Sequence, residues 1–393
     1  MKSNYNILGN HIRQIDVRNT ENVTDTVLGI SIDKYFMPSV ANVIGTDLSR
    51  YKLITKGKFA CNPMHVGRDE RLPVALYFGD VPAIVSPAYF MFEIIDESVL
   101  NSEYLMMWFR RPEFDRSCWL RTDGSVRGGI TWDDICRLEI PVSDYCEQLR
   151  IVEKYKAITD RIALKQRIND NLADQCACVL YNQYSIDIEN NQPWVKHTVQ
   201  SLIDLGYIEA PMDGNHGEIH PKASDYVSSG IPFIMANNLS DGFVNLTQCA
   251  FISESQAKTL RKGFAKPNDV LLTHKATLGR VAIVPEGYEY IILTPQVTYY
   301  RVLKGISSVY LRYYFASSYF QSNLESFADG GSTRAYVGIT KQCGLPVYLP
   351  CESSMVTISK ALEKIENLRC NNQAEIVRLS ELQNALITQL SSR

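Results

Sequence analysis

Long apolar runs, paired cysteines and a secretory start are all missing from this 393-residue chain. No apolar run approaches the length of about eighteen residues needed to cross a bilayer. Residues Met1 to Asn6 contain no apolar stretch of signal-peptide length. Ten cysteines occur without zinc-ligand spacing, and only Cys176 and Cys178 lie close together. We therefore expect a cytoplasmic protein with reduced thiols, no metal site and no membrane partner.

Catalytic motifs are also missing. The sequence has no Walker loop and no Gly-x-Ser-x-Gly elbow. The segment Asn62-Pro63-Met64-His65 partly resembles the loop with which amino-methyltransferases hold a flipped adenine, but a second proline and a tyrosine are absent. No glycine-rich strand-to-helix turn that could hold S-adenosylmethionine precedes it. The sequence therefore predicts a non-catalytic chain with no cofactor of its own.

One pair among the six histidines has the spacing of two metal ligands on a helix. His216 and His220 lie four residues apart, but they flank Gly217 and precede Pro221. Glycine and proline favour a loop over a helix at this position. We favour an ordinary loop there over a metal site.

The net charge is −3, so the chain lacks the surplus of positive charge that is typical of a simple nucleic-acid binder. Lysines and arginines are nevertheless concentrated in two stretches. These are Arg50, Lys52, Lys56, Lys58, Arg68 and Arg71, and then Lys258, Arg261, Lys262, Lys266, Lys275 and Arg280. Either stretch alone could be a solvated face. Their recurrence in both halves of the chain favours two basic patches for one extended polyanion.

The sequence contains an internal repeat. In each half, a β-rich, aromatic-rich stretch leads into a long amphipathic helix. The apolar residues of one short helix recur at a constant offset: Tyr104, Leu105, Trp108, Phe109 and Phe114 match Tyr310, Leu311, Tyr314, Phe315 and Phe320. The loops Gly124-Ser125-Val126-Arg127 and Gly331-Ser332-Thr333-Arg334 match next, followed by Ile140-Pro141 and Leu349-Pro350. A loop kept in two diverged copies favours a shared task, such as phosphate contact.

Both long helices carry apolar residues alternately four and three apart, which is the seam of a coiled coil. The apolar seam positions are Ile151, Tyr155, Ile158, Ile162 and Leu172, and then Ile358, Leu362, Ile365, Leu379 and Leu386. Polar residues, among them Asn169 and Asn372, interrupt both seams and would fix the register. Each helix could instead be an ordinary core helix. A length of roughly forty residues, about 60 Å, favours two rods that pack on each other.

These patterns predict an α+β fold with two similar β-rich modules and two long helices. The expected order is residues 1–142 for the first module and 143–186 for the first long helix, then 187–350 for the second module and 351–393 for the second helix. Residues 187–193, polar and closed by a proline, form the expected linker into the second module.

Two loops offer recognition chemistry. Residues 273–280 lie between two apolar strands and supply cations, hydroxyls and a glycine, which can bind phosphate oxygens or read base edges. Residues 62–68 occupy a comparable place in the first module. Either loop could also be an ordinary polar turn.

In the order of these motifs, over nearly its whole length, the chain resembles the DNA-specificity subunit of Type I restriction-modification systems. That family has two variable recognition modules, each with a Gly-Ser-x-Arg loop, an Ile/Leu-Pro step and a long helix. Residues Glu147 to Val152 resemble the family's Glu-Gln-x-x-Ile-Val helix start. Residues Ser354 to Ile358 lack the Glu-Gln pair, which leaves the start of the second helix open.

The resemblance implies that the two modules are target recognition domains and that the helices form an antiparallel coiled coil. Each module would read one part of a bipartite target in the major groove of double-stranded DNA. Two modification subunits would bind the chain, use S-adenosylmethionine and methylate adenine at N6. Restriction subunits that use ATP and Mg are optional further partners. The chain itself would be a reader and not an enzyme.

Candidate DNA contacts follow from the two loops and the two basic stretches. For phosphate contact we select Lys52, Lys58, Arg127, Lys262 and Arg334. For base readout we select His65, Arg68, His274, Lys275, Thr277 and Arg280. The alternative function is a coiled-coil scaffold that assembles proteins without binding DNA.

Overall fold

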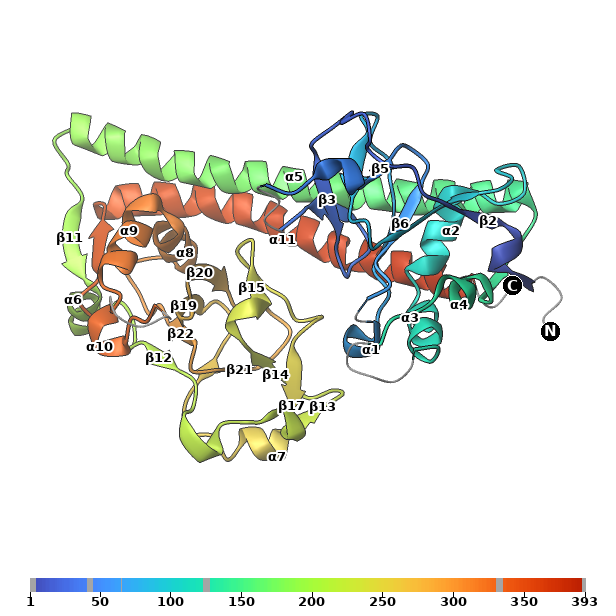
Figure 1. Ribbon diagram of the computed structural model, residues 1–393. Coiled ribbons are helices and arrows are strands. Elements are labelled where there is room, and N and C mark those ends of the chain that lie inside the picture. The colour runs from blue at the N-terminus through green and yellow to red at the C-terminus, as the bar shows by residue number, and fades with distance from the viewer. Residues whose placement is uncertain (1–4, 41–44, 65, 123–127, 330–334, 391–393) are drawn as a thin grey trace. The chain divides into compact units, whose positions relative to one another are not determined.

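The computed structural model describes residues 5–390 except 41–44, 65, 123–127 and 330–334 (Figure 1). Its contacts define two compact units, Met1–Leu164 with Glu375–Arg393, and Lys165–Ala374. The long helices α5 (Tyr145–Glu189) and α11 (Glu352–Gln389) contribute to both units. The structure therefore begins the second long helix at Glu352, the point that the sequence left open.

The first module combines two four-stranded sheets. One has the strand order β2-β9-β6-β7 and the other β4-β3-β8-β5, and all pairs are antiparallel except the parallel β3–β8 pair. Its strands among the described residues are β1 (Tyr5–Ile7), β2 (Ile12–Ile15), β3 (Val27–Ile30), β4 (Phe36–Pro38), β5 (Lys52–Ile54), β6 (Phe59–Cys61), β7 (Val74–Leu76), β8 (Ala83–Val85), β9 (Phe90–Ile94) and β10 (Glu139–Pro141). The helices are α1 (Val66–Asp69), α2 (Ser102–Phe109), α3 (Pro112–Trp119) and α4 (Trp132–Cys136), with 3-10 turns at Leu8–Asn10 and Leu48–Arg50.

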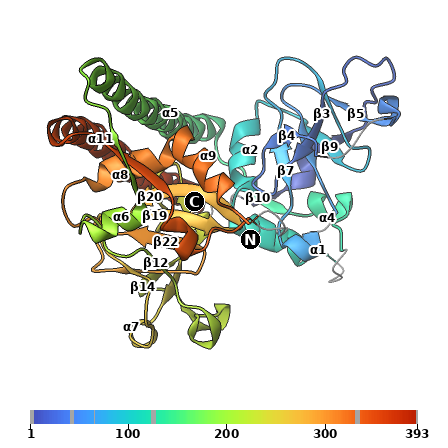
Figure 2. The ribbon, with the colours of Figure 1, turned by 90° about the vertical axis from the view of Figure 1, so that its left-hand side faces the viewer.

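The second module repeats this plan (Figure 2). Its four-stranded sheet has the order β12-β22-β19-β20, and its five-stranded sheet, β13-β17-β14-β21-β18, again contains one parallel pair, β14–β21. The strands described are β11 (Val195–Thr198), β12 (Met212–Asp213), β13 (Tyr226–Val227), β14 (Ile231–Ile234), β15 (Leu239–Ser240), β16 (Phe243–Val244), β17 (Ala250–Ile252), β18 (Phe264–Ala265), β19 (Val270–Lys275), β20 (Thr277–Ile283), β21 (Ile291–Leu293), β22 (Val297–Tyr300) and β23 (Pro346–Leu349). The helices are α6 (Val199–Asp204), α7 (Glu254–Ala257), α8 (Ser308–Ala316), α9 (Ser318–Ser326) and α10 (Ile339–Gln342), with 3-10 turns at Gly217–Ile219, Ala223–Asp225 and Ala236–Asn238.

Strand register aligns β2, β9 and β6 of the first module with β12, β22 and β19 of the second. In the first, Ile15 lies opposite Met91, which lies opposite Ala60. In the second, Met212 lies opposite Tyr299, which lies opposite Leu271. Residues one step further along, such as Asp16 and Asp213, therefore occupy matching places in the two sheets.

The repeated aromatic helices supply much of each core. α2 starts where the Asn101 side chain accepts the N–H groups of Glu103 and Tyr104, and α8 starts where Ser307 accepts that of Tyr310. All ten residues of the repeated aromatic pattern are buried. Burial of each such side chain contributes about 1.5–3 kcal/mol, so these helices hold the sheets in place.

The coiled-coil seam is formed as the heptad pattern predicts, and this confirms the α+β fold with two similar modules and an antiparallel helix pair. The ten predicted apolar seam residues are all buried or half-buried. In the second unit the Nδ2 of Asn372 donates to the Oδ1 of Asn169 at 3.0 Å, and Lys165 donates to Asn372 at 2.8 Å. In the first unit Gln383 donates to Thr159 at 2.7 Å. Polar partners of this kind fix one register.

None of the helices among the described residues combines the length and the apolar character needed to cross a membrane. The described residues also contain no group of three or more His, Cys, Asp or Glu placed to hold a metal ion. His216 and His220 flank a 3-10 turn, where His216 pairs with Asp213 and His220 lies 3.2 Å from the backbone oxygen of Asn215.

Candidate nucleic-acid interface

The two loops selected from the sequence lie at matching ends of the two four-stranded sheets. The connection between β6 and β7, residues 62–73, leaves at the end of the sheet where β2 finishes. The β19–β20 connection leaves where β12 finishes. The two differ in build, because the first contains α1, whereas residues 273–280 belong to β19 and β20 except for a turn at Ala276. The expectation that residues 273–280 form a loop was therefore wrong. A duplicated position with divergent loops is suited to reading two different sequences.

Three of the selected side chains are exposed around the second loop. Lys275 and Thr277 stand on either side of the turn, and the Lys275 ammonium lies 5.8 Å from the ring centre of Tyr336. Arg280, further along β20, donates to the backbone oxygens of Ala236 at 3.2 Å and Leu239 at 3.0 Å. These three residues can offer cationic or hydroxyl donors to a ligand.

His274, selected for base readout, is instead fully buried. Its Nδ1 lies 2.8 Å from the Thr298 hydroxyl, and its Nε2 has no hydrogen-bond partner among the described residues. Burial lowers the pKa of His274 to about 4. The side chain therefore supports the hairpin from inside the sheet, and its burial is at odds with the expected base contact. β19 has a bulge or irregularity between Leu272 and His274. In such a strand the simple alternation of side chains between the two faces does not predict which face His274 occupies.

Two lysines selected for phosphate contact hold carboxylates instead. Lys52 is only 5% exposed and donates to the backbone oxygen of Tyr89 at 2.7 Å, while its ammonium lies 3.4 Å from Asp16. Lys262 forms an ion pair with the buried Asp213. Their positive charges are thus largely compensated within the protein.

Lys58 is compensated in the same way, because it and Arg13 both bind the carboxylate of Glu93. Arg68 lies on α1 and is exposed, but it donates twice to the neighbouring Asp69, at 2.6 and 2.9 Å. His65, Arg127 and Arg334, also selected as DNA contacts, lie outside the described residues.

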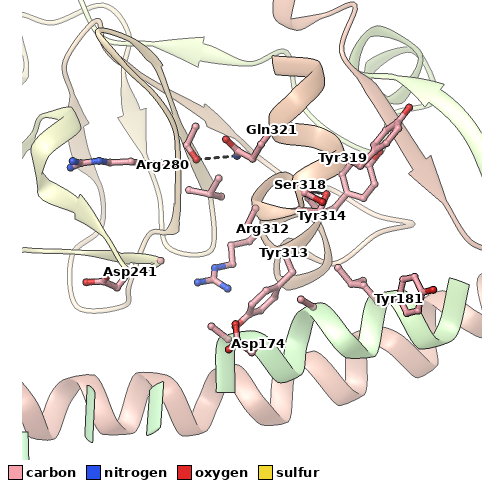
Figure 3. A pocket seen from close by; sticks show the side chains of 18 of the residues that line it. Asp174, Tyr181, Asp241, Arg280, Arg312, Tyr313, Tyr314, Ser318, Tyr319 and Gln321 are labelled. Atoms are coloured by element: carbon pink, nitrogen blue, oxygen red, sulfur yellow. Dashed lines mark hydrogen bonds between the residues drawn. The ribbon is translucent and has the colours of Figure 1, made fainter. Parts of the chain in front are cut away.

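A groove of about 1110 Å³ lies within the second unit, between α5, the β15–β16 turn, β20 and helices α8 and α9 (Figure 3). Acidic residues line one part, namely Asp170, Asp174 and Asp241. Tyr181 on α5 and Tyr319 on α9 line it as well and are 71% and 46% exposed. The groove thus joins carboxylates to exposed aromatic rings.

A buried cation closes the inner wall of this groove. Figure 3 shows Arg312 reaching from α8 toward the turn that contains Asp241. Its guanidinium lies 3.9 Å from the Tyr313 ring centre and 3.9 Å from the Glu366 carboxylate. Gly242 has a φ of +85°, which residues with a Cβ rarely adopt, so the turn favours glycine there.

No protein-family model matches the chain, and no curated protein matches its sequence. Among solved structures, the chain is similar to the S subunit of a Type I restriction-modification system from M. genitalium. That comparison covers 98% of this chain and 95% of the other, with a TM-score of 0.55 and 13% identity. The chain has the S-subunit fold.

Two further solved structures align over the same span at lower TM-scores. One comes from work on complex assembly and conformational transition of the type I R-M system, with a TM-score of 0.42, 16% identity and coverage of 98% and 96%. The other is the HsdS subunit from Thermoanaerobacter tengcongensis, with a TM-score of 0.38, 16% identity and coverage of 98% and 95%.

Within this S-subunit fold, sequence reasoning overlooked the carboxylates that organise the loop ends of both sheets. Burial would raise the pKa of Asp213, but hydrogen bonds from Lys262 and His216 outweigh burial and hold it below the usual value. Asp16 likewise has a lowered pKa, because bonds from Arg18 and Lys52 outweigh its desolvation. The repeat offset that aligned the aromatic helices does not hold between Asp16 and Asp213. Only strand register reveals that they correspond.

Proposed function

We propose that the chain is the DNA-specificity subunit of a Type I restriction-modification complex. Each module reads one part of a bipartite target in double-stranded DNA, and partner subunits carry out adenine-N6 methylation and restriction. The observation that carries the proposal is the duplication itself: two matching sheets present divergent loops at the same end, and a coiled coil connects the modules. The S-subunit fold, which extends over 98% of this chain, supports the same conclusion.

The exposed residues of the second loop support base reading. Lys275 and Arg280 can donate to guanine O6 and N7 or to phosphates, and Thr277 can bond to either. With a net charge of −3 the chain has little general attraction for DNA. Affinity then depends on local cations and on basic surfaces that the partners add.

Two modification subunits, which bind S-adenosylmethionine, are the proposed partners, and restriction subunits that use ATP and Mg are optional ones. The groove beside α5 supports an assembly role, because exposed aromatic rings next to charged residues are typical of protein-binding surfaces. The chain itself is proposed to be non-catalytic and cytoplasmic.

The deciding experiment is methylome sequencing of host DNA with and without this gene. The expected result is loss of N6-methyladenine from one split motif when the gene is deleted. The variant Arg280→Ala should relax the second half of that motif and leave the first half unchanged. Equal relaxation of both halves would contradict the assignment of Arg280.

The alternative function, a coiled-coil scaffold without DNA binding, predicts an unchanged methylome. Direct binding then separates the two, because affinity for phosphates falls steeply as salt rises, whereas an apolar scaffold interface is insensitive to salt. A chain assembled with its partners that shows no salt-dependent DNA binding would favour the scaffold.

A further inference from the structure

In the first module, one carboxylate holds two cations at the loop end of the sheet. Asp16, the residue after β2, accepts a hydrogen bond from the Nη2 of Arg18 at 2.8 Å, and the Lys52 ammonium lies 3.4 Å away. The Nη1 of Arg18 donates to the backbone oxygen of Arg50 at 2.8 Å. The described contacts therefore use two of the five guanidinium N–H groups, and 37% of the Arg18 side chain stays exposed.

The second module contains the same cluster. Asp213, at the end of β12, accepts from Lys262, and the Nε2 of His216 lies 2.8 Å from its other oxygen. Asp213 is 4% exposed, whereas 53% of the His216 side chain is exposed. In each module, then, a lysine at or near the start of an edge strand and a basic residue just after the aspartate bind one carboxylate.

Both clusters lie where a ligand of the divergent loops would pass. Asp16 ends the strand beside β9, and the β6–β7 loop leaves from the same end. Asp213 holds the matching place beside β22, at the same end of the sheet as the β19–β20 hairpin. The carboxylate and the lysine are common to the two copies, while the exposed nitrogen-bearing side chain differs, arginine in one and histidine in the other. The shared aspartate and lysine are suited to a structural role, whereas Arg18 and His216, which differ between the modules, are suited to distinguishing DNA sequences.

We propose that Arg18 and His216 each read a base edge, one in each half of the bipartite target, and that Asp16 and Asp213 are positioning residues that orient them. This inference rests on the proposed function. Arg18 presents only donors, so it reads the N7 and O6 acceptors of a guanine in the first half-site.

The chemistry of His216 is complementary to that of Arg18. An ionised carboxylate only accepts hydrogen bonds, so the Nε2 of His216 carries the proton that faces Asp213. In the neutral imidazole the Nδ1 is then an acceptor, and the described contacts include no partner for it. It therefore reads an amine on a base, the N6 group of adenine or the N4 group of cytosine, in the second half-site.

The test is binding-site selection from a randomised duplex library by the full chain assembled with its modification subunits. Arg18→Ala should lower discrimination for one guanine of the first half-site by about 10- to 100-fold, which is the range for one good base contact. His216→Phe keeps a ring but removes the acceptor, and it should relax one adenine or cytosine of the second half-site. Each variant should leave the other half-site as selective as before.

Control variants separate base reading from general weakening. Arg137→Ala removes a largely exposed arginine that pairs with Asp134 in the first module and lies outside both basic stretches, and it should leave both half-sites unchanged. Asp16→Asn should relax the same guanine as Arg18→Ala but less strongly, and Arg18→Lys should restore binding without restoring full selectivity.

Uniform loss of affinity with unchanged base preference would overturn the proposal and assign a phosphate-binding or structural role to the cluster. Thermal unfolding of each variant detects simple misfolding. If the unaltered complex selects no bipartite site at all, the proposed function fails, and this outcome is visible before any variant is compared.

Discussion

The two modules stabilise the same part of the sheet with ion clusters of reversed charge: two cations around a carboxylate in the first module, and two carboxylates around a cation in the second. In the first, the cations Arg13 and Lys58 bind the central carboxylate of Glu93. In the second, strand register places Arg301 and Asp269 at the positions of Glu93 and Lys58. Glu209, whose N–H donates to the backbone oxygen of Arg301, lies opposite Arg301 as Arg13 lies opposite Glu93. Arg301 donates to Asp269 at 2.9 and 2.7 Å and to Glu209 at 3.1 Å.

This reversal shows that the positions require charge complementarity and not a particular sign. A phosphate-binding lysine could not be replaced by an aspartate in the sister module, and yet Lys58 corresponds to Asp269. In this structure Lys58 has a structural role in its ion pair with Glu93, and its contact with phosphate stays a prediction. Comparison within the chain thus separates residues that hold the fold from residues free to meet a ligand.

The largest expected effect tests whether the two clusters differ in strength. Arg301→Ala leaves the 2%-exposed Asp269 without its cationic partner, with only the Lys266 N–H still bound, and should destabilise the protein by about 3–5 kcal/mol. Glu93→Ala should cost only about 1 kcal/mol, because Arg13 and Lys58 can reach solvent. Urea unfolding of both variants checks the difference. Arg301→Met with Asp269→Leu should recover most of the loss, and equal costs for the two single variants would contradict the argument.

A second difference is that, among the described residues, the fully buried histidine, His274, belongs to the second module. The folded pKa of His274, about 4, lies below the unfolded value of about 6.5, so the unfolded chain binds more protons in between. The contribution of His274 to the free energy of unfolding should be fully present above about pH 6.5. It should decrease by about 3 kcal/mol as the pH falls to 4. Unfolding curves between pH 7 and 4 measure this slope. His274→Gln should flatten it, and an unchanged slope would count against the assignment.

The smallest effect concerns the coiled coil. Asn169, 5% exposed in the second unit, should cost about 1–3 kcal/mol when changed to alanine, because its hydrogen bonds to Asn372 and Arg369 are lost in a buried place. Arg161, largely exposed in the first unit, pairs with Glu375 and should cost less than about 1 kcal/mol. Thermal unfolding compares the two, and a reversed order would show that the polar seam contributes little.

Periodic patterns made the duplicated fold and the helix seam predictable from the sequence. Tyr104 and Tyr310, or Ile151 and Ile358, are spaced by helix geometry, which the chain carries in its local order. The candidate interface was harder to predict from the sequence. Nothing in the local sequence distinguishes Lys52 and Lys262 from surface lysines, and they form ion pairs with aspartates only when distant strands come together. The burial of His274 could not be predicted for a related reason: residues 270–274 of β19 are buried on both faces of the sheet, which local sequence order does not reveal.

Arg369 sets a limit on how far the second module can be treated as a separable part. It is only 2% exposed in the helix seam, and it donates to Glu366, to the Tyr313 hydroxyl and, at 2.7 Å, to the backbone oxygen of Asp241 at the β15–β16 turn. A graft of residues 195–349 onto another coiled coil would leave that turn without its anchor. The transferable piece must include the helical segment around Arg369, so the natural boundary for exchanging this module lies within the long helix and not at its end.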